Sequence, residues 1–451
     1  MTTGFIMLIV FLFMAILMYF EKISTMLVLP LMAVIFAIVA VTSNFINKGI
    51  PETVSGFAII PYIFNQYSVL VSDIFAKGAV RLAPVIITTI FGGMLAIYIR
   101  NLKIAEKMIY WTAEFAGDKP FIIGLALFVV TFLLFTSIGG LGSVIMVGAI
   151  ILPILSSVGI SPVAGSGIFL LGICAGGTIN PGNLKLYMET FGIPQGEVIQ
   201  FAQFALLVYI LCALVWMLIT IRKSTMSNFW AVKINVEKLK LSPLSFLAPI
   251  VPVILVFFFK VDPVVAFIIS LAYTFVISLR KGAVRLFCKS LIEGAQAVMP
   301  ASILMIGIGM LLQCVLNEQV NVHLNPILTK VIPHTWIFYL IGFGLCAPLA
   351  LYRGPLNVWG LGFGLGTLIF SSGILSPKAV MGMLISVGML QGVCDPTNTH
   401  NVWIASYQGI TPNKILRNTL PFVWIAAFVG LAISAYLYVG LGDGIMKLFG
   451  K

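Results

Sequence analysis

The chain of 451 residues is 60% hydrophobic and only 9% charged, with a mean hydropathy of +1.12. A soluble globular protein carries about a quarter charged residues, so this composition excludes that class and predicts a membrane protein. The net charge of +12 does not indicate a nucleic-acid partner, because surplus Lys and Arg in short loops set the orientation of membrane proteins. Long apolar runs recur along the chain and favour spanning helices over a β-barrel.

The amino-terminal run GFIMLIVFLFMAILMYF begins at residue 4. It lacks a basic flank and a small-residue cleavage site, so we expect a retained helix rather than a signal peptide. The six cysteines are scattered without a CxxC pair, and the three histidines form no HExxH motif. These patterns predict neither disulfides nor a metal site, and they disfavour a membrane-embedded enzyme.

The chain contains an internal repeat. Residues 78–101, GAVRLAPVIITTIFGGMLAIYIRN, match residues 294–317, GAQAVMPASILMIGIGMLLQCVLN, at an offset of 216. The two segments share a Gly-Ala pair, a proline, a Gly-Met-Leu triplet and a final asparagine. Further along, an offset of 215 aligns NPGN at 180–183 with DPTN at 395–398. Ordered matches at nearly one offset predict a tandem duplication of about 215 residues per half.

In chain order, the first half (1–221) is expected to hold spans at about 4–20, 26–43 and 79–99, a re-entrant hairpin over 121–158, a broken helix over 163–190 and a span over 201–221. A cytoplasmic linker, 222–243, follows. The second half (244–451) is expected to hold spans at about 245–259, 263–279 and 294–316, a hairpin over 335–372, a broken helix over 378–406 and a span over 420–440. Semi-polar stretches at 102–117 and 318–333 precede the two hairpins.

The hairpins are predicted from short apolar arms around polar, Gly-rich centres, SIGGLGS at 137–143 and LYRGPLN at 351–357. Each arm of about 15 residues covers roughly 22 Å, which is short for a span. Two kinked spans per pair are the alternative. With hairpins, each half crosses the membrane five times, and an odd number of crossings inverts the second half. The sequence therefore predicts an all-α polytopic membrane protein built from two inverted-topology repeats, each with a hairpin and a broken helix.

The distribution of basic residues predicts the orientation. Sixteen Lys and Arg fall on the side of the 222–243 linker and eight on the other, while two lie at the breaks. The richer side should be cytoplasmic, which places both termini outside. Residues 44–77 are an insertion in the first half, and if 56–72 spans separately the amino terminus is inside instead.

The two breaks, GGTINPGN at 176–183 and GVCDPTN at 392–398, place polar helix breakers in apolar surroundings. Irregular backbone at membrane depth is tolerated where it lines a cavity or is buried in protein. Half-helix ends there offer N–H groups to anions and C=O groups to cations. We therefore expect the breaks to form two halves of one binding site, with the hairpin tips facing them. The alternative is that Gly and Pro only kink packed helices.

Few ionisable groups lie at the breaks, and each has two interpretations. Arg353 at a hairpin tip suits bidentate carboxylate recognition, or it pairs with Asp395. Lys185 binds an anion or extends to the membrane surface. Asp395 replaces Asn180 of the other half and is expected to carry a proton or bind Na⁺. His400 is expected at the edge of the cavity.

These considerations give a candidate site without a cofactor, and without a metal apart from a coupling Na⁺. The expected substrate ligands are Ser137, Gly139, Gly140, Asn180, Asn183, Lys185, Arg353, Gly354, Asn357, Thr397 and Asn398. The expected coupling-cation ligands are Asp395, Thr178, Asn180 and Ser143.

The layout resembles the ion-transporter superfamily of bacterial secondary carriers, which includes divalent anion–sodium symporters, citrate–metal symporters, C4-dicarboxylate carriers and gluconate-type permeases. The SIGGLGS tip followed by an arm with Pro153 is similar to the citrate and gluconate-type branches. The Ser-Asn-Thr tips of the divalent-anion symporters are absent here, so their ligand chemistry does not transfer. The resemblance implies a homodimer in a bacterial or archaeal plasma membrane, with a transport part that moves like an elevator against a scaffold.

The predicted function is secondary active transport of a small organic anion, a carboxylate, imported by alternating access with H⁺ or Na⁺. A cation/proton antiporter of the same fold is the alternative. An antiporter needs only carboxylates at the breaks, whereas two basic groups there favour an anion. The expected partners are this anion, the lipid bilayer and a second copy of the chain.

Overall fold

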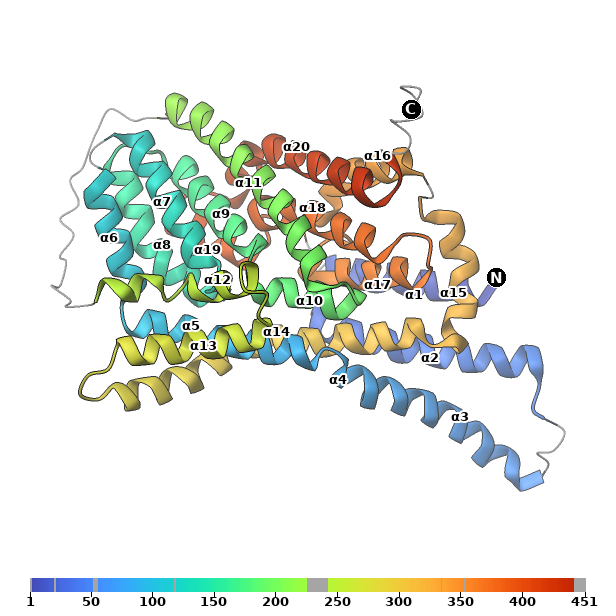
Figure 1. Cartoon of the computed structure of the whole chain (residues 1–451). Helices are drawn as coiled ribbons and strands as arrows, with labels where there is room; N and C mark the ends of the chain where they lie inside the picture. The colour runs from blue at the N-terminus through green and yellow to red at the C-terminus, as the bar shows by residue number, and fades with distance from the viewer. Residues whose placement is uncertain are drawn as a thin grey trace.

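The computed structural model describes residues 2–19, 22–51, 56–116, 119–224, 242–333, 335–352 and 354–441. These parts of the chain form helices and loops without a strand (Figure 1). Within them, seven helices are long and apolar enough to cross a membrane, or up to nine when each of two bent helix pairs counts as one span. The predicted class of an all-α polytopic membrane protein is confirmed.

The first half begins with α1 (Thr2–Tyr19), α2 (Thr25–Lys48), η1 (Gly56–Ala58), α3 (Ile59–Asp73), η2 (Ile74–Gly78), α4 (Ala79–Arg81), α5 (Ala83–Asn101) and α6 (Ile104–Ala116). It continues with α7 (Pro120–Phe135), α8 (Gly140–Ser157), α9 (Pro162–Thr178), α10 (Pro181–Phe191) and α11 (Gln195–Ser224). Most of the linker expected at 222–243 lies outside the described residues.

The second half begins with η3 (Pro243–Leu247), α12 (Val251–Phe257), α13 (Pro263–Ile277), α14 (Ala283–Leu316) and α15 (Glu318–Val331). It continues with α16 (Trp336–Cys346), η4 (Ala347–Ala350), η5 (Val358–Gly362), α17 (Phe363–Ser371), α18 (Pro377–Cys394), α19 (Thr399–Tyr407) and α20 (Pro412–Tyr438). The span expected at 245–259 is thus divided into a short 3₁₀ turn and a two-turn helix, because Pro249 and Pro252 lack the N–H groups that a continuous helix needs.

The insertion expected at 44–77 is largely the first part of one long helix. Gly56–Asn101 forms a single helical stretch of 46 residues, which includes a π-helical turn at Ile74–Gly78. Figure 1 shows α3, α4 and α5 following one another without a reversal of direction. At about 1.5 Å per residue the stretch is roughly 70 Å long, far more than the ~30 Å of a bilayer core. Since the chain does not turn back, residues 56–72 add no separate crossing.

The two halves meet at a crossing of α5 and α14 that is built from glycines. A methyl group on Gly294 would lie 2.6 Å from the nitrogen of Met94, and one on Gly78 would lie 2.7 Å from Cα of Met310. At the repeat offset of 216, Gly78 corresponds to Gly294 and Met94 to Met310. The same contact therefore occurs twice, once from each half, as a two-fold relation between inverted repeats requires.

The two segments expected as hairpins each form two helical arms, but the arms pack differently in the two halves. The arms α7 and α8 pack against each other, whereas α16 packs against α18 and α20 and its partner arm α17 packs against α14. Helix α8 begins at Gly140, inside the stretch expected as the tip. The broken helices also differ, because α9 and α10 are bent by 49° while α18 and α19 stay within one helical direction.

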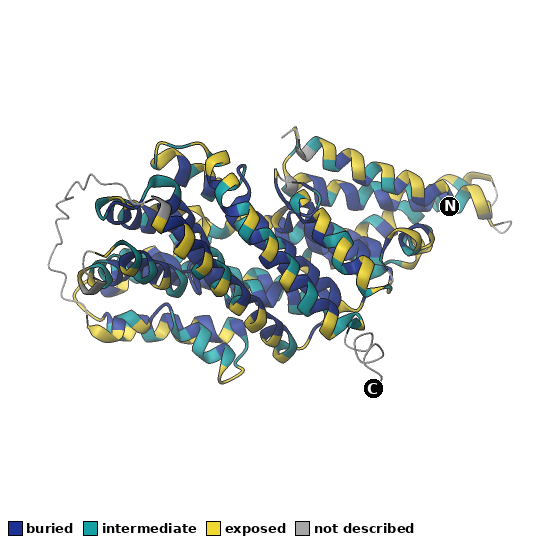
Figure 2. Cartoon of the chain, turned by 90° about the horizontal axis from the view of Figure 1, so that it is seen from above, coloured by how far each residue is buried: buried dark blue, intermediate teal, exposed yellow. Residues whose placement is uncertain are grey.

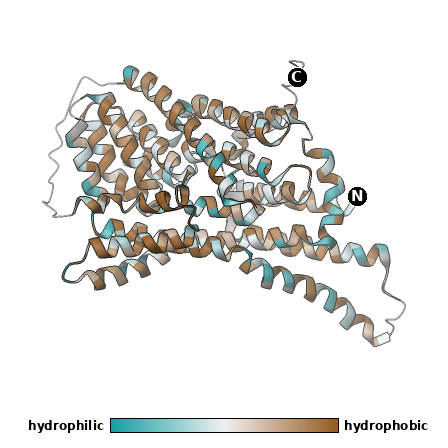
Figure 3. Cartoon of the chain, viewed as in Figure 1, coloured by the Kyte–Doolittle hydropathy of each residue, from teal (hydrophilic) through white to brown (hydrophobic). Residues whose placement is uncertain are grey.

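The broken helix α18–α19 lies inside the protein, whereas helices α11 and α20 lie nearer its outside. The most apolar stretch of α18 and α19 is 89% buried, against 39% for α11 and for α20. Figure 2 shows buried residues along the inward faces of the helices, and Figure 3 shows that hydrophobic residues also cover the outer helices. The outer surface is therefore suited to lipid, and the breaks are enclosed by protein.

Candidate functional site

The helices that precede the two breaks contact each other. Gly392 of α18 faces Cys174 of α9 so closely that a methyl group on the glycine would overlap the Sγ atom. Both residues lie about one turn before their breaks, at Thr178 and Asp395. The fold therefore brings the two matched breaks together in the interior of the protein.

At the second break, Asp395 ties the break to the tip of its own hairpin. Its Oδ1 accepts hydrogen bonds from the backbone N–H of Tyr352 (3.0 Å) and from Thr397, through N–H (2.9 Å) and hydroxyl (2.7 Å). Its Oδ2 accepts a hydrogen bond from Nδ2 of Asn357 (3.1 Å). Three predicted site residues, Asp395, Thr397 and Asn357, thus form one cluster, and Asp395 is only 1% exposed.

The hydrogen bonds of Asp395 limit what this carboxylate can bind. An ionised carboxylate has about four lone-pair sites, and four protein donors already converge on this one. Three of these donors converge on Oδ1 and one on Oδ2, so Oδ2 keeps a lone pair for a coupling proton or Na⁺. Because the single donor to Oδ2, Asn357, belongs to the hairpin tip, a cation bound at Oδ2 would lie beside the tip.

The first break repeats this arrangement with an amide in place of the carboxylate. Asn180 accepts from the N–H of Gly182 (2.9 Å) and donates through Nδ2 to the carbonyl of Phe135 (3.4 Å), at the end of α7. Asn183 donates to the carbonyl of Gly177 (2.7 Å) at the end of α9. The hydroxyl of the predicted ligand Thr178 donates to the carbonyl of Cys174 within α9 (2.9 Å).

The tip of the first hairpin is open. Gly139, Gly140 and Gly142 have no heavy atom within 4 Å of the position that a Cβ would take, and all three are exposed. These residues form the start of α8, whose first N–H groups have no helical acceptor. The backbone here can approach a ligand closely. Ser143 is 5% exposed, and its hydroxyl makes no hydrogen bond within the described parts of the chain.

Other predicted ligands lie in structural positions. The hydroxyl of Ser137 donates to the carbonyl of Pro249. Asn398 caps α19 by accepting from the N–H of His400 (3.3 Å). Gly354 packs against the backbone of the tip, where a side chain would overlap the Leu349 carbonyl.

Arg353, which was expected to bind a carboxylate or to pair with Asp395, lies outside the described residues.

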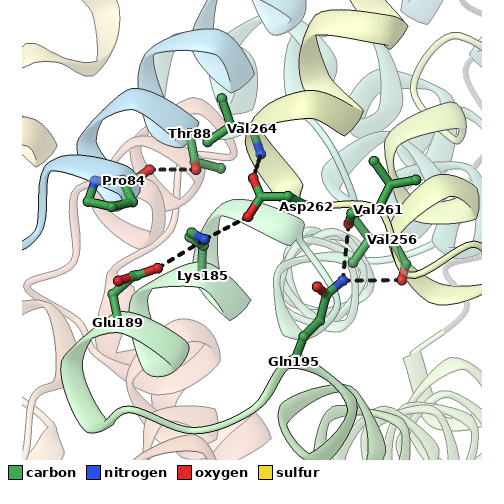
Figure 4. A network of polar contacts seen from close by, with 9 residues as sticks. All are labelled: Pro84, Thr88, Lys185, Glu189, Gln195, Val256, Val261, Asp262 and Val264. Carbon is green, nitrogen blue, oxygen red and sulfur yellow. Dashed lines mark hydrogen bonds and ion pairs between the residues drawn. The ribbon is translucent and has the colours of Figure 1, made fainter.

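Lys185 lies apart from the Asp395 cluster, in an ion network shown in Figure 4. Its ammonium is 2.7 Å from Oδ2 of Asp262 and 2.9 Å from Oε1 of Glu189. The other carboxylate oxygen of Asp262 accepts from the N–H of Val264 (2.9 Å) and caps α13. The lysine side chain is 9% exposed. It is therefore paired within the protein and joins α10 of the first half to α13 of the second.

Two residues of the site were missed by sequence reasoning. Asp262 is marked in the sequence only as an N-cap before Pro263, and its partner is 77 residues away. Gln391 is buried in an apolar helix, and its Oε1 accepts from the N–H groups of Val358 (2.6 Å) and Trp359 (3.4 Å). It thereby caps the returning arm of the second hairpin, a role that no local pattern signals.

The two broken helices stand in different surroundings. Helix α10 packs against α11 as its counterpart α19 packs against α20, and both contact α9. Helix α10 also packs against α5, α12 and α13, whereas α19 packs against α8. In a two-fold arrangement, α19 would contact α14 and α2 as α10 contacts α5 and α13. The halves therefore share one plan but have adopted two packing arrangements of it.

We expect Lys185→Gln to destabilise the protein by about 1–3 kcal/mol, because the ion-paired hydrogen bonds to Asp262 and Glu189 are lost. Lys77→Gln is the matched control, since Lys77 pairs with Asp73 at 2.6 Å but is 73% exposed. An exposed pair of this kind contributes about 0–1 kcal/mol. Thermal unfolding of both variants in detergent measures the difference, and equal shifts would show that the Lys185 network adds nothing.

The architecture is that of a polytopic all-α membrane protein with inverted repeats. The solved structure of the YdaH transporter of Alcanivorax borkumensis, reported with an unusual topology, is similar over 92% of this chain and 98% of its own, with a TM-score of 0.60. The sequences are 12% identical, so the likeness concerns the fold. No family model and no curated protein sequence matches the chain. Membership of the ion-transporter superfamily stays a prediction.

Proposed function

We propose that this protein is a secondary active transporter that imports a small organic anion with H⁺ or Na⁺ by alternating access. The observation that carries the proposal is the meeting of two matched breaks inside a membrane-spanning fold, the second bonded to the tip of its hairpin and the first to the end of the preceding arm, α7. Helix breaks at membrane depth that line a binding site are the usual device of secondary transporters.

The open tip of the first hairpin supports an anionic substrate. Gly139, Gly140 and Gly142 leave backbone N–H groups accessible at the start of α8, and the amino-terminal end of a helix carries partial positive charge. Asn183 lies at the adjacent break. In this proposal the substrate carboxylate is bound by these N–H groups, and Asn183 and Asn398 supply further polar contacts.

The unequal packing of α10 and α19 supports alternating access. If the two halves exchange their arrangements, α10 leaves α5 and α13 while α19 moves against α14. This exchange breaks the pair between Lys185 and Asp262 and turns the site toward the other side of the membrane. An elevator-type movement of the hairpins and broken helices against α2, α5, α13 and α14, in a homodimer, is consistent with this exchange.

A cation/proton antiporter remains the second candidate, and one observation favours it. Lys185, one of two basic groups that favoured an anion, is neutralised by Asp262 and Glu189. The buried carboxylate of Asp395 is the group that an antiporter would titrate. An antiporter predicts cation fluxes without any organic anion, so the transport assay separates the two.

The test uses Gly139→Ala and Gly142→Ala in full-length protein reconstituted into liposomes. Both positions have room for a methyl group, and the φ of Gly139 is −161°, which any residue adopts. Folding should therefore be unchanged. If a carboxylate approaches these backbone N–H groups, each variant should reduce uptake of radiolabelled organic acids at least tenfold, the effect of losing about 1.4 kcal/mol of binding.

Gly196→Ala is the control, because that glycine also lies in the first turn of a helix with nothing within 4 Å of the added methyl. It should transport normally. If both tip variants take up substrate as well as the wild-type protein does, the first hairpin tip is not part of the substrate site. Cation/proton exchange by wild-type protein in the absence of organic anions would favour the antiporter.

A further inference from the structure

A groove away from the breaks is lined by two basic residues. It has a volume of about 640 Å³ and lies where the first turn of α9, the end of α11 and the start of α20 meet. Its lining includes Lys414, Arg417 and Asn418 of α20, Thr220 of α11 and Ser161, the N-cap of α9. Three helix ends mark the boundary of the membrane-spanning part, so the groove lies at the level of lipid headgroups.

Among the described residues, the cations of the groove have no counter-ion. Within the described parts of the chain, Lys414 and Arg417 make neither an ion pair nor a side-chain hydrogen bond. The hydroxyl of Thr220, a residue that is 8% exposed, also makes no hydrogen bond there. Two positive charges and a hydroxyl donor thus face the same space without an anion to bind.

Asn418 presents a further donor, because a hydrogen bond from Trp216 fixes the orientation of its side-chain amide. The indole N–H of Trp216, which is fully buried, donates to Oδ1 of Asn418 (2.9 Å). With its oxygen held by the indole, the amide directs its Nδ2 group away from Trp216, and this group makes no hydrogen bond among the described residues. Trp216 in turn packs directly onto Gly167 of α9, where a methyl group would overlap the ring. This side of the groove is therefore closely packed, and it presents the Nδ2 group of Asn418 as a donor.

The equivalent place in the other half shows what this groove lacks. Gly192 and Gly409, which both have a positive φ, end α10 and α19. When the sequences of the two halves are aligned on these glycines, Glu197 corresponds to Lys414. At the offset of 215, Lys378 corresponds to Val163, which also lines the groove. In the other half, Lys378 and Glu197 form an ion pair at 2.8 Å. In the groove, Lys414 takes the position of that carboxylate, so the described lining residues supply cations and no anion.

An apolar strip connects the groove with the lipid-facing surface. On α11, Leu207, Leu211, Val215 and Ile219 recur at intervals of four residues and are 55%, 53%, 49% and 40% exposed. This spacing places them on one face of the helix, and Ile219 itself lines the groove. A free phosphate ion would not use such a strip, whereas the acyl chains of a lipid would lie along it.

We propose that the groove between α9, α11 and α20 binds the phosphate headgroup of an acidic phospholipid. Lys414 and Arg417 neutralise the headgroup, Asn418 and Thr220 donate hydrogen bonds to it, and the acyl chains follow the apolar face of α11. Basic pockets between membrane helices are recurrent sites for such lipids. The bound anion takes the place that Glu197 fills in the other half.

The experiment measures phosphatidylglycerol binding to the purified full-length protein by native mass spectrometry, which resolves single lipid-binding events. The double variant Lys414→Gln/Arg417→Gln should weaken the tightest event about 30-fold, because each cation near an anionic lipid contributes roughly a fivefold factor. Asn418→Asp should also weaken it, since it replaces the Nδ2 donor by a charged oxygen but keeps the bond from Trp216. Lys281→Gln/Arg285→Gln removes the same charge from two exposed cations outside the groove and should leave binding unchanged.

The outcomes distinguish the ligands. Phosphatidylglycerol affinity that is unchanged in the groove variants would overturn the proposal, as would equal binding of phosphatidylcholine to wild-type protein. Inorganic phosphate that displaces phosphatidylglycerol at equal concentration would identify a free anion as the ligand instead. If the double variant does not fold, the single variants Lys414→Gln and Arg417→Gln are measured, and each should show about a fivefold loss.

Discussion

Asp395→Asn is expected to abolish gradient-driven accumulation of substrate while substrate exchange across the membrane persists. If Asp395 carries the coupling cation, the neutral amide can no longer take up and release a charge. Exchange does not require that step, because the site can reorient with substrate bound. The substitution also makes the two halves alike at this position, since the first half already has Asn180.

The same variant should lose stability for a separate reason. Oδ1 of the new amide can still face Tyr352 and Thr397, but its NH₂ group then meets Nδ2 of Asn357, which now lies 3.1 Å from the carboxylate. Two donors facing each other leave a buried group unsatisfied, which costs about 1–3 kcal/mol. Turning the amide over would oppose its NH₂ group to three donors, so this orientation offers no relief.

A double-mutant cycle with Asn357→Ala separates the two effects. In the Asn357→Ala background the opposing donor is gone, so Asp395→Asn should cost less stability there than in the wild-type protein. The transport defect should persist in the double variant, because the charge is still missing. Melting temperature, exchange and accumulation are measured on both single variants and the double. Wild-type accumulation by Asp395→Asn would exclude a coupling role for this carboxylate.

Gly294→Ala is expected to prevent formation of the α5–α14 crossing or to destabilise it by about 1–3 kcal/mol or more. The added methyl would lie 2.6 Å from the nitrogen of Met94 and 2.7 Å from the carbonyl oxygen of Gly93. These are backbone atoms of a helix, so they cannot rotate away as a side chain can. The two helices, and with them the two halves of the protein, would have to separate.

Gly342→Ala is the matched control for this prediction. It lies inside α16 and has nothing within 4 Å of the added methyl, so the better helix propensity of alanine should leave stability unchanged or raise it by up to about 1 kcal/mol. The yield of folded protein and its unfolding temperature in detergent are compared. A Gly294→Ala variant as stable as Gly342→Ala would show that the crossing is not close-packed in solution.

The sequence by itself determined the class, the repeat and the position of the breaks. These properties follow from local rules, because apolar runs of spanning length must be helical in lipid and helix breakers must lie where their backbone is satisfied. The Gly-Ala and Gly-Met-Leu matches that revealed the duplication are also the residues of the α5–α14 crossing, since close approach of two helices needs glycine in both copies.

Only the tertiary structure decided which polar groups meet. Lys185 looked like a free cation at a break, yet Asp262 reaches it from the start of α13 in the other half. Asp395 looked like an available cation ligand, yet two groups from the tip of its hairpin, the N–H of Tyr352 and Nδ2 of Asn357, donate hydrogen bonds to it. The same holds for Lys414, whose lack of a carboxylate becomes visible only beside the pair of Lys378 and Glu197. Partners of this kind come from distant parts of the chain, and their distances depend on how helices pack, which residue order alone does not specify.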